Sequence, residues 1–248
     1  MVVFLVVFAC LMGAAVGGLY CARLLPRHHL SAASKDVIYA FMNLIALLAA
    51  VVLGLLIFAA KTAYDTKDME WKHASANIIL LDRVLAHYGP EAAAARDLLK
   101  AAVSRKLAQL ESNPAGQSSG SRPLVAGIEE VQDAVRKLSP TTDAQRLVKS
   151  RALEIGGDIA KARWFLMENV DSTVPVAFLA ILVFWLAFIF FSYGLFAEGN
   201  ATVISVLLLC ALSLAGSVYL IFEMDNSLEG PISISTAPLK RALEYLGR

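Results

Sequence analysis

Four long stretches without a charged residue are the feature that most restricts how this 248-residue chain can fold. They cover residues 2–22, 37–60, 176–197 and 201–222. A bilayer core about 30 Å thick needs about 20 apolar helical residues to cross it, and each stretch has that length. The sequence therefore predicts an all-α, polytopic membrane protein with four transmembrane helices and a helical-bundle soluble domain between helices two and three.

Residues 1–22 have a second interpretation, as a cleaved secretory signal peptide. Such a peptide has a basic segment before a short apolar core. Here no Lys or Arg precedes the stretch, which stays apolar through Ala22. A retained first transmembrane helix is the favoured interpretation.

The composition argues against an ordinary soluble domain and against nucleic acid as a partner. Hydrophobic residues make up 58% of the chain and charged residues 17%, whereas a soluble domain has about 25% charged residues. The net charge of +1 gives no excess of Lys and Arg for binding nucleic acid. Cys10, Cys21 and Cys210 lie in or beside apolar stretches, where they act as small packing residues.

The charged positions divide the rest of the chain. We expect residues 23–36 to form a basic loop, with Asp36 as the N-cap of a second helix over 37–60 that ends at Lys61. Residues 61–175 are expected to form the soluble helical domain. Within it, residues 112–123 are rich in Ser, Gly and Pro and are expected to form a flexible linker. Residues 223–248 are expected to form a C-terminal tail.

Within the soluble domain, apolar residues recur at three- and four-residue spacing, which is typical of helices that bury one face. The positions are Ile78, Leu81, Leu85 and Tyr88; Leu99, Val103, Leu107 and Leu110; Leu124, Ile128, Val131, Val135 and Leu138; and Ala144, Val148, Ala152, Ile155, Ile159, Ala162 and Leu166. Each helix has one such stripe, so we expect these helices to pack on one another or on a neighbouring subunit.

The distribution of Lys and Arg predicts the orientation. Four spans put both termini and the soluble domain on one side of the membrane. The basic residues near membrane ends on that side are Lys61, Lys67, Lys72, Lys161, Arg163, Lys240, Arg241 and Arg248, against Arg23, Arg27 and Lys35 on the other. Cytoplasmic segments carry the excess of Lys and Arg, so a cytoplasmic bundle with cytoplasmic termini is expected, although the first helix alone favours the reverse.

Few residues in the sequence belong to a recognisable catalytic or binding motif. The metalloprotease, serine-hydrolase and phosphate-loop motifs do not occur, so we expect no enzyme, cofactor or metal centre. Asn43 is the amide within a transmembrane stretch, and it predicts either a helix–helix hydrogen bond or a polar position on a permeation path. Gly13 and Gly17 have the spacing of a helix-packing motif.

The acidic residues after the fourth stretch are a further candidate site. Glu223, Asp225 and Glu229 could bind a cation through their carboxylate oxygens. An exposed turn, or pairing with basic residues of the bundle, is the alternative.

Four segments of the chain resemble the bestrophin-like membrane protein family. They are Cys21-Ala-Arg23-Leu-Leu-Pro26-Arg-His-His29-Leu-Ser; Leu81-Asp82-Arg83 with Tyr88-Gly89-Pro90; Val183-Phe-Trp185 with Gly194-Leu-Phe196 and Asn200; and Gly230-Pro-Ile-Ser-Ile-Ser235. The resemblance covers nearly the whole chain. It implies a bacterial inner-membrane location and a distant similarity to bestrophin anion channels, which are pentamers.

In those channels the second membrane helix lines the pore and narrows it at successive four-residue steps around a Val-Leu-Gly stretch. The resemblance therefore nominates Leu47, Val51 and Leu55, around Val52-Leu53-Gly54, as a pore constriction. The acidic run that binds calcium in animal bestrophins is not reproduced here, so calcium gating is not implied.

The leading hypothesis is a homo-oligomeric channel for small anions in the lipid bilayer, and the resemblance favours a pentamer. A non-conducting membrane sensor or assembly scaffold is the second hypothesis. The spans have no charged residue at their centres, which argues against a proton-driven pump or charge-coupled transporter.

Overall fold

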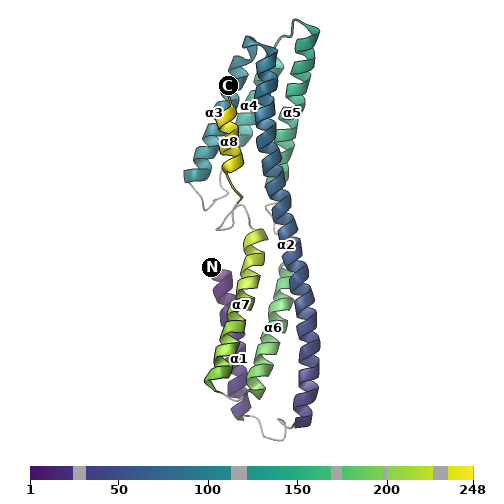
Figure 1. Cartoon of the computed structure of the whole chain (residues 1–248), viewed down its shortest axis with the longest axis vertical. Coiled ribbons are helices and arrows are strands. Elements are labelled where there is room, and N and C mark those ends of the chain that lie inside the picture. The colour runs from purple at the N-terminus through teal and green to yellow at the C-terminus, as the bar shows by residue number, and fades with distance from the viewer. Residues whose placement is uncertain (25–31, 113–121, 169–174, 198–199, 226–233, 248) are drawn as a thin grey trace. The chain divides into compact units, whose positions relative to one another are not determined.

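A computed structural model of the chain describes residues 1–24, 32–112, 122–168, 175–197, 200–225 and 234–247. The elements in these ranges are α1 (Val2–Leu24), α2 (Ala32–Tyr88), the short 3₁₀ turn η2 (Pro90–Ala92), α3 (Ala93–Ser112), α4 (Arg122–Lys137), α5 (Asp143–Glu168), α6 (Val176–Phe196), α7 (Ala201–Asp225) and α8 (Ala237–Tyr245) (Figure 1). The described residues contain no strand, which confirms the all-α class. Helices α1, α2, α6 and α7 are long and apolar enough to cross a membrane, as expected for an integral membrane protein.

The chain forms two compact units. The first, called here the membrane unit, comprises Met1–Ala63 and Ser172–Asp225. The second, called the bundle unit, comprises Tyr64–Asp171 and Asn226–Arg248. Helix α2 contributes its first half to the membrane unit and its second half to the bundle unit.

In the membrane unit, α1 packs along α6 and α7. The closest approach uses glycine on both α1 and α6. A Cβ atom on Gly18 would meet the carbonyl oxygen of Phe191 and would lie 2.8 Å from the backbone nitrogen of Leu195. A Cβ atom on Gly194 would meet the carbonyl oxygen of Ala15 in the same way. Small residues at these positions therefore let the two backbones touch, as is common in membrane helix pairs.

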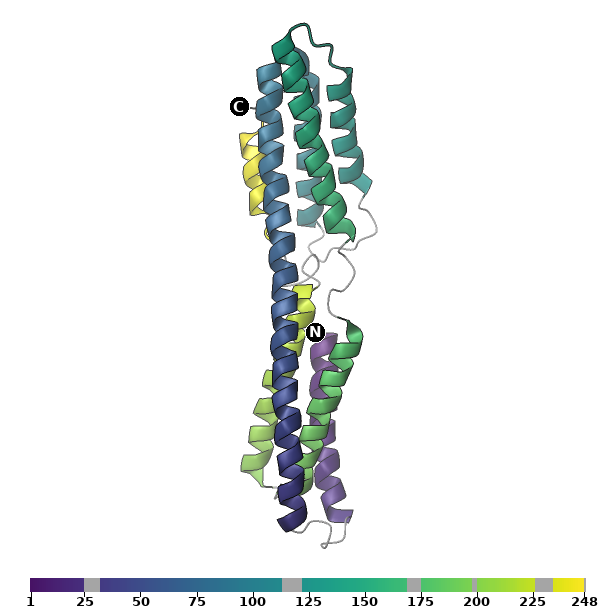
Figure 2. The ribbon, with the colours of Figure 1, turned by 90° about the vertical axis from the view of Figure 1, so that its right-hand side faces the viewer.

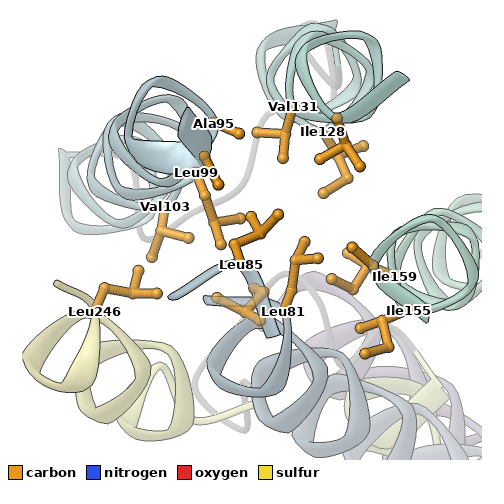
Figure 3. Close-up of a cluster of buried hydrophobic side chains, with 14 of the residues drawn as sticks. Leu81, Leu85, Ala95, Leu99, Val103, Ile128, Val131, Ile155, Ile159 and Leu246 are labelled. Carbon is orange, nitrogen blue, oxygen red and sulfur yellow. The ribbon is translucent and has the colours of Figure 1, made fainter. Parts of the chain in front are cut away.

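In the bundle unit, the second half of α2 packs with α3, α4, α5 and α8 around one apolar core. Figure 3 shows side chains from these helices pointing toward one another. The core residues include Leu81, Leu85, Leu99, Val103, Ile128, Val131, Ile155, Ile159 and Leu246. The predicted stripes thus pack on one another within the chain, although Ala144, at the start of the α5 stripe, is exposed, and the side chain of Leu124 lies outside what the structure describes.

The boundaries of α2 differ from the expected ones. The helix begins at Ala32, so Asp36 lies within it instead of capping it, and it continues past Lys61 to Tyr88 as one unbroken ribbon (Figure 2). The change in polarity at Lys61 marks the end of the apolar stretch, but residues 61–68 contain no Gly or Pro to end a helix. Thr62 even donates its hydroxyl to the carbonyl of Phe58 within the helix. The helix ends at Tyr88 and is followed by Gly89, whose φ of 125° favours glycine, and by Pro90.

Two other boundaries also shift. The expected linker 112–123 lies mostly outside the described residues, but Ser112 ends α3 and Arg122 begins α4. The C-terminal tail contains α8, which the sequence reading missed. Leu239, Ala242 and Leu246 are buried in the bundle core, and their spacing of three and four residues is the signal that could have revealed the helix.

Candidate functional site

One side of α2 in the membrane unit is apolar and uncovered within the chain. Met42, Ala49, Leu56 and Ala60 are buried, and the last three belong to the core shared with α1, α6 and α7. On other sides of the same helix, Leu47 is 64% exposed, Val51 54% and Leu55 63%. The three nominated constriction residues therefore lie away from the core of their own chain.

The uncovered side extends along the whole membrane half of α2. Its large residues follow alternating three- and four-residue steps, the spacing of a seam between packed helices. They are Phe41, Leu44, Leu48, Val51, Leu55 and Phe58, and all are exposed. We call these six residues the α2 seam. A seam of this length must face lipid, another subunit or a water-filled path.

Two further residues modify this surface. Asn43, one turn before Leu47, is exposed, so its amide makes no buried helix–helix contact within the chain. Gly54 is also exposed, and a Cβ atom there would meet nothing within 4 Å. Glycine in a helix interior is less favourable than alanine by roughly 1 kcal/mol. Because there is room for a Cβ atom at position 54, packing inside the chain does not explain why glycine is present there.

The predicted glycine motif on α1 is displaced by one position within the chain. A Cβ atom on Gly13 would meet nothing within 4 Å, and one on Gly17 would make only ordinary contact with the Phe191 ring at 3.9 Å. The close contact belongs to Gly18. A role for Gly13 and Gly17 in packing between subunits stays a prediction.

Two acidic residues of the candidate cation site, Glu223 and Asp225, lie in the last turn of α7. Glu223 is 7% exposed and Asp225 3%, so the alternative of an exposed turn is wrong for both. The Tyr219 hydroxyl donates a hydrogen bond to Glu223, whose Oε1 atom is buried without a hydrogen bond from the described residues. Glu229 lies outside the described residues, and within them no three His, Cys, Asp or Glu side chains gather into a metal site.

The Leu81-Asp82-Arg83 and Tyr88-Gly89-Pro90 segments hold the bundle together. Asp82 is buried and accepts two hydrogen bonds from Arg96, at 2.7 Å from Nε and 3.0 Å from Nη2, and a third from the backbone N–H of Gly247 at 3.3 Å. This carboxylate therefore joins α2, α3 and the residues after α8.

The charge state of Asp82 follows from these contacts. Burial acts to raise the pKa of Asp82, but the hydrogen bonds from Arg96 and Gly247 and the positive charge of Arg96 outweigh it and hold the pKa below its usual range. Sequence reading noted Asp82 but missed Arg96, because the pairing depends on how α2 and α3 are aligned. Asp82 and Arg96 therefore stabilise the fold of the bundle.

Comparison with known proteins agrees with this architecture. A search among curated proteins gives no match. Among solved structures, a mutant of a bacterial bestrophin homologue from Klebsiella pneumoniae is similar in fold, with a TM-score of 0.68 and 14% sequence identity over 98% of this chain and 96% of the other. The family model described as a Bestrophin-like domain matches residues 9–239. The chain therefore belongs to the bestrophin-like family.

Proposed function

We propose that this protein is a homo-oligomeric ion channel that conducts small anions through an axial pore lined by α2. The observation that carries the proposal is the α2 seam, which is apolar, long and uncovered within the chain. Copies arranged around an axis would turn this side of α2 toward the axis and toward one another. Val51 and Leu55 of the seam, with the exposed Leu47 beside it, would then form the constriction.

The chemistry of the seam suits passive conduction. Residues 37–60 contain no Asp, Glu, His, Lys or Arg, so the path offers no acidic or basic side chain for coupling to protons. Apolar constrictions gate by losing and regaining water, which needs only a small change in radius. Asn43 would supply a polar ring one turn from Leu47. The preference for anions rests on the family resemblance.

The assembly we propose is a pentamer in a bacterial inner membrane, with the bundle and both termini in the cytoplasm. The excess of Lys and Arg on the bundle side supports this orientation. Gly13 and Gly17 would allow close packing between subunits, since Gly13 has open space around it. Glu223, Asp225 and Glu229 are proposed as a cation-binding group, supported by the buried Glu223 oxygen.

The test is ion flux through liposomes that contain the purified chain. Leu47→Ala, Val51→Ala and Leu55→Ala should each widen the constriction and raise chloride flux over that of the wild type. Leu209→Ala is the matched control, because Leu209 on α7 is also 63% exposed and apolar but is not part of α2. Absence of flux in the wild type and all variants, or an equal increase in the control, contradicts the proposal.

A non-conducting sensor or scaffold is the second candidate function, and the continuity of α2 favours it. One helix of 57 residues belongs to both units, so a shift in bundle packing can reach the membrane unit without crossing a loop. The sensor predicts no flux and an assembly with no open path along its axis. A high-resolution image of the purified oligomer distinguishes the two functions.

A further inference from the structure

The start of α2 and the end of α6 meet in a cluster of aromatic rings within the membrane unit. The centroid of the Tyr39 ring lies 5.7 Å from that of Phe196 and 6.3 Å from that of Tyr193. Both separations lie in the range over which aromatic rings attract one another. The ammonium group of Lys35, one helical turn before Tyr39, lies over the Phe196 ring, 5.8 Å from its centroid, as in a cation–π contact. We call these four residues the α2–α6 cluster.

The cluster lies where two of the charge-free stretches end. Tyr39 is the third residue of the stretch 37–60, and Lys35 comes just before that stretch. Phe196 is the last residue of α6, and the stretch 176–197 ends one residue later. Two helices therefore place the cluster independently at the boundary between the apolar core of the bilayer and its headgroups. Tyr is enriched at this level of membrane proteins, and Lys extends its ammonium group from there toward water.

The charge of Lys35 is held in place but is not neutralised in the described part of the chain. Lys35 forms no ion pair or hydrogen bond there, and its one contact of that kind is with the Phe196 ring. Phe196 is buried, so the ring is a fixed support for the ammonium group. Tyr193 is 42% exposed and Tyr39 is half-buried, and both carry hydroxyl groups that donate hydrogen bonds. The cluster thus combines a positive charge and hydrogen-bond donors at headgroup level.

Helix α1 brings residues of the same kind to this end of the membrane unit. It runs in the same direction as α6 (Figure 1), and the backbone at Gly18 lies against that at Leu195, so the residues after Gly18 are level with the end of α6. Tyr20 is 63% exposed, and Arg23 is exposed. Tyr and basic residues together are typical of helix ends among headgroups, whereas Lys is depleted at the centres of protein–protein interfaces. Lipid is therefore favoured over a second subunit as the neighbour of the cluster.

We propose that the α2–α6 cluster binds the phosphate group of an anionic membrane phospholipid. Lys35 donates charge-assisted hydrogen bonds to the phosphate oxygens, which are strong acceptors. The Phe196 ring keeps the ammonium group in position, and Tyr39 and Tyr193 cover the part of the lipid below the phosphate. Free inorganic phosphate presents the same oxygens to Lys35 without the lipid, and it is the competing ligand. The site is independent of conduction, because it requires only that the chain lies in a membrane.

Thermal unfolding of the purified full chain in detergent tests the site. Short-chain phosphatidylglycerol should raise the unfolding temperature of the wild type by a few degrees, because a ligand that binds only the folded state stabilises it. Lys35→Gln should remove most of this rise, and Phe196→Leu should reduce it, since the ammonium group loses its support. Arg23→Gln is the matched control and should keep the rise, because Arg23 is a cation at the same end that contacts no aromatic ring in the described ranges.

Each result decides for or against the site. A wild type that phosphatidylglycerol does not stabilise overturns the proposal, and a full rise with inorganic phosphate at equal ionic strength assigns the site to the free ion instead. A rise that Lys35→Gln keeps, or that Arg23→Gln loses to the same extent, also overturns it, because the lipid then binds elsewhere or responds to any positive charge. If Phe196→Leu does not fold, native mass spectrometry of the wild type and Lys35→Gln replaces it, and equal numbers of retained phosphatidylglycerol molecules contradict the site.

Discussion

At the scale of single residues, the buried Asp82 has the largest predicted effect on stability. Asp82→Asn removes the charge that Arg96 faces, and breaking a buried pair typically costs about 3–5 kcal/mol. We expect a clear fall in unfolding temperature at neutral pH. Asp133→Asn is the control, because Asp133 and Arg136 form an exposed pair whose loss costs about 1 kcal/mol or less.

The same pair gives a pH dependence with a definite sign. Because the folded-state pKa of Asp82 is lowered, its contribution is fully present above the unfolded value of about 3.9 and is lost as pH falls through the folded value. The difference in unfolding temperature between wild type and Asp82→Asn should therefore be constant near pH 6–7 and shrink below about pH 4. A difference that grows in acid contradicts this assignment.

Gly18 provides a second prediction at this scale. Gly18→Ala places a Cβ against the Phe191 carbonyl oxygen, and overpacking of this kind costs about 1–3 kcal/mol or more. Gly13→Ala should leave the packing of α1 on α6 intact, because a Cβ atom at Gly13 meets nothing within 4 Å in the same chain. If Gly13 packs between subunits, the alanine variant instead changes the mass of the oligomer, which native mass spectrometry measures.

At the scale of helices, sequence reading succeeds where apolar content or spacing determines the outcome. The four membrane helices and the stripes of α3, α4 and α5 were predictable because each is a local pattern. The predicted end of the second helix at Lys61 was wrong, because the change from apolar to polar residues there does not interrupt the backbone hydrogen bonds of the helix. The sequence could not predict which side of α2 is uncovered, because apolar residues occur on every side of the helix over residues 37–60.

Helix α8 is the clearest element to test, because Leu239 and Ala242, together with Leu246 just after the helix, are buried in the bundle core. Leu246→Ala should destabilise the bundle by about 2–5 kcal/mol, the usual range for a core leucine. Leu147→Ala removes a leucine that is 73% exposed on α5, and it should change the stability by about 0.5 kcal/mol or less. Equal effects of the two substitutions in urea unfolding would mean that α8 is not docked.

At the scale of the whole molecule, the α2 seam predicts association. The seam residues are exposed within their own chain, and the channel proposed above has five copies. Native mass spectrometry of the purified protein should give one dominant species with the mass of a pentamer. A monomer at all concentrations would remove the basis for an axial pore, and a dimer would favour the sensor.

The glycine contact between α1 and α6 also determines when the membrane unit can be completed. Gly18 and Gly194 are 176 residues apart, so the first helix enters the bilayer long before its main partner has been made. At roughly 5–20 residues per second, that delay is about 9–35 s. During this interval α1 has neither α6 nor α7 beside it. The nascent chain must therefore keep its first helix in lipid or at the insertion machinery while the bundle helices emerge, and the membrane unit closes only after α6 and α7 arrive.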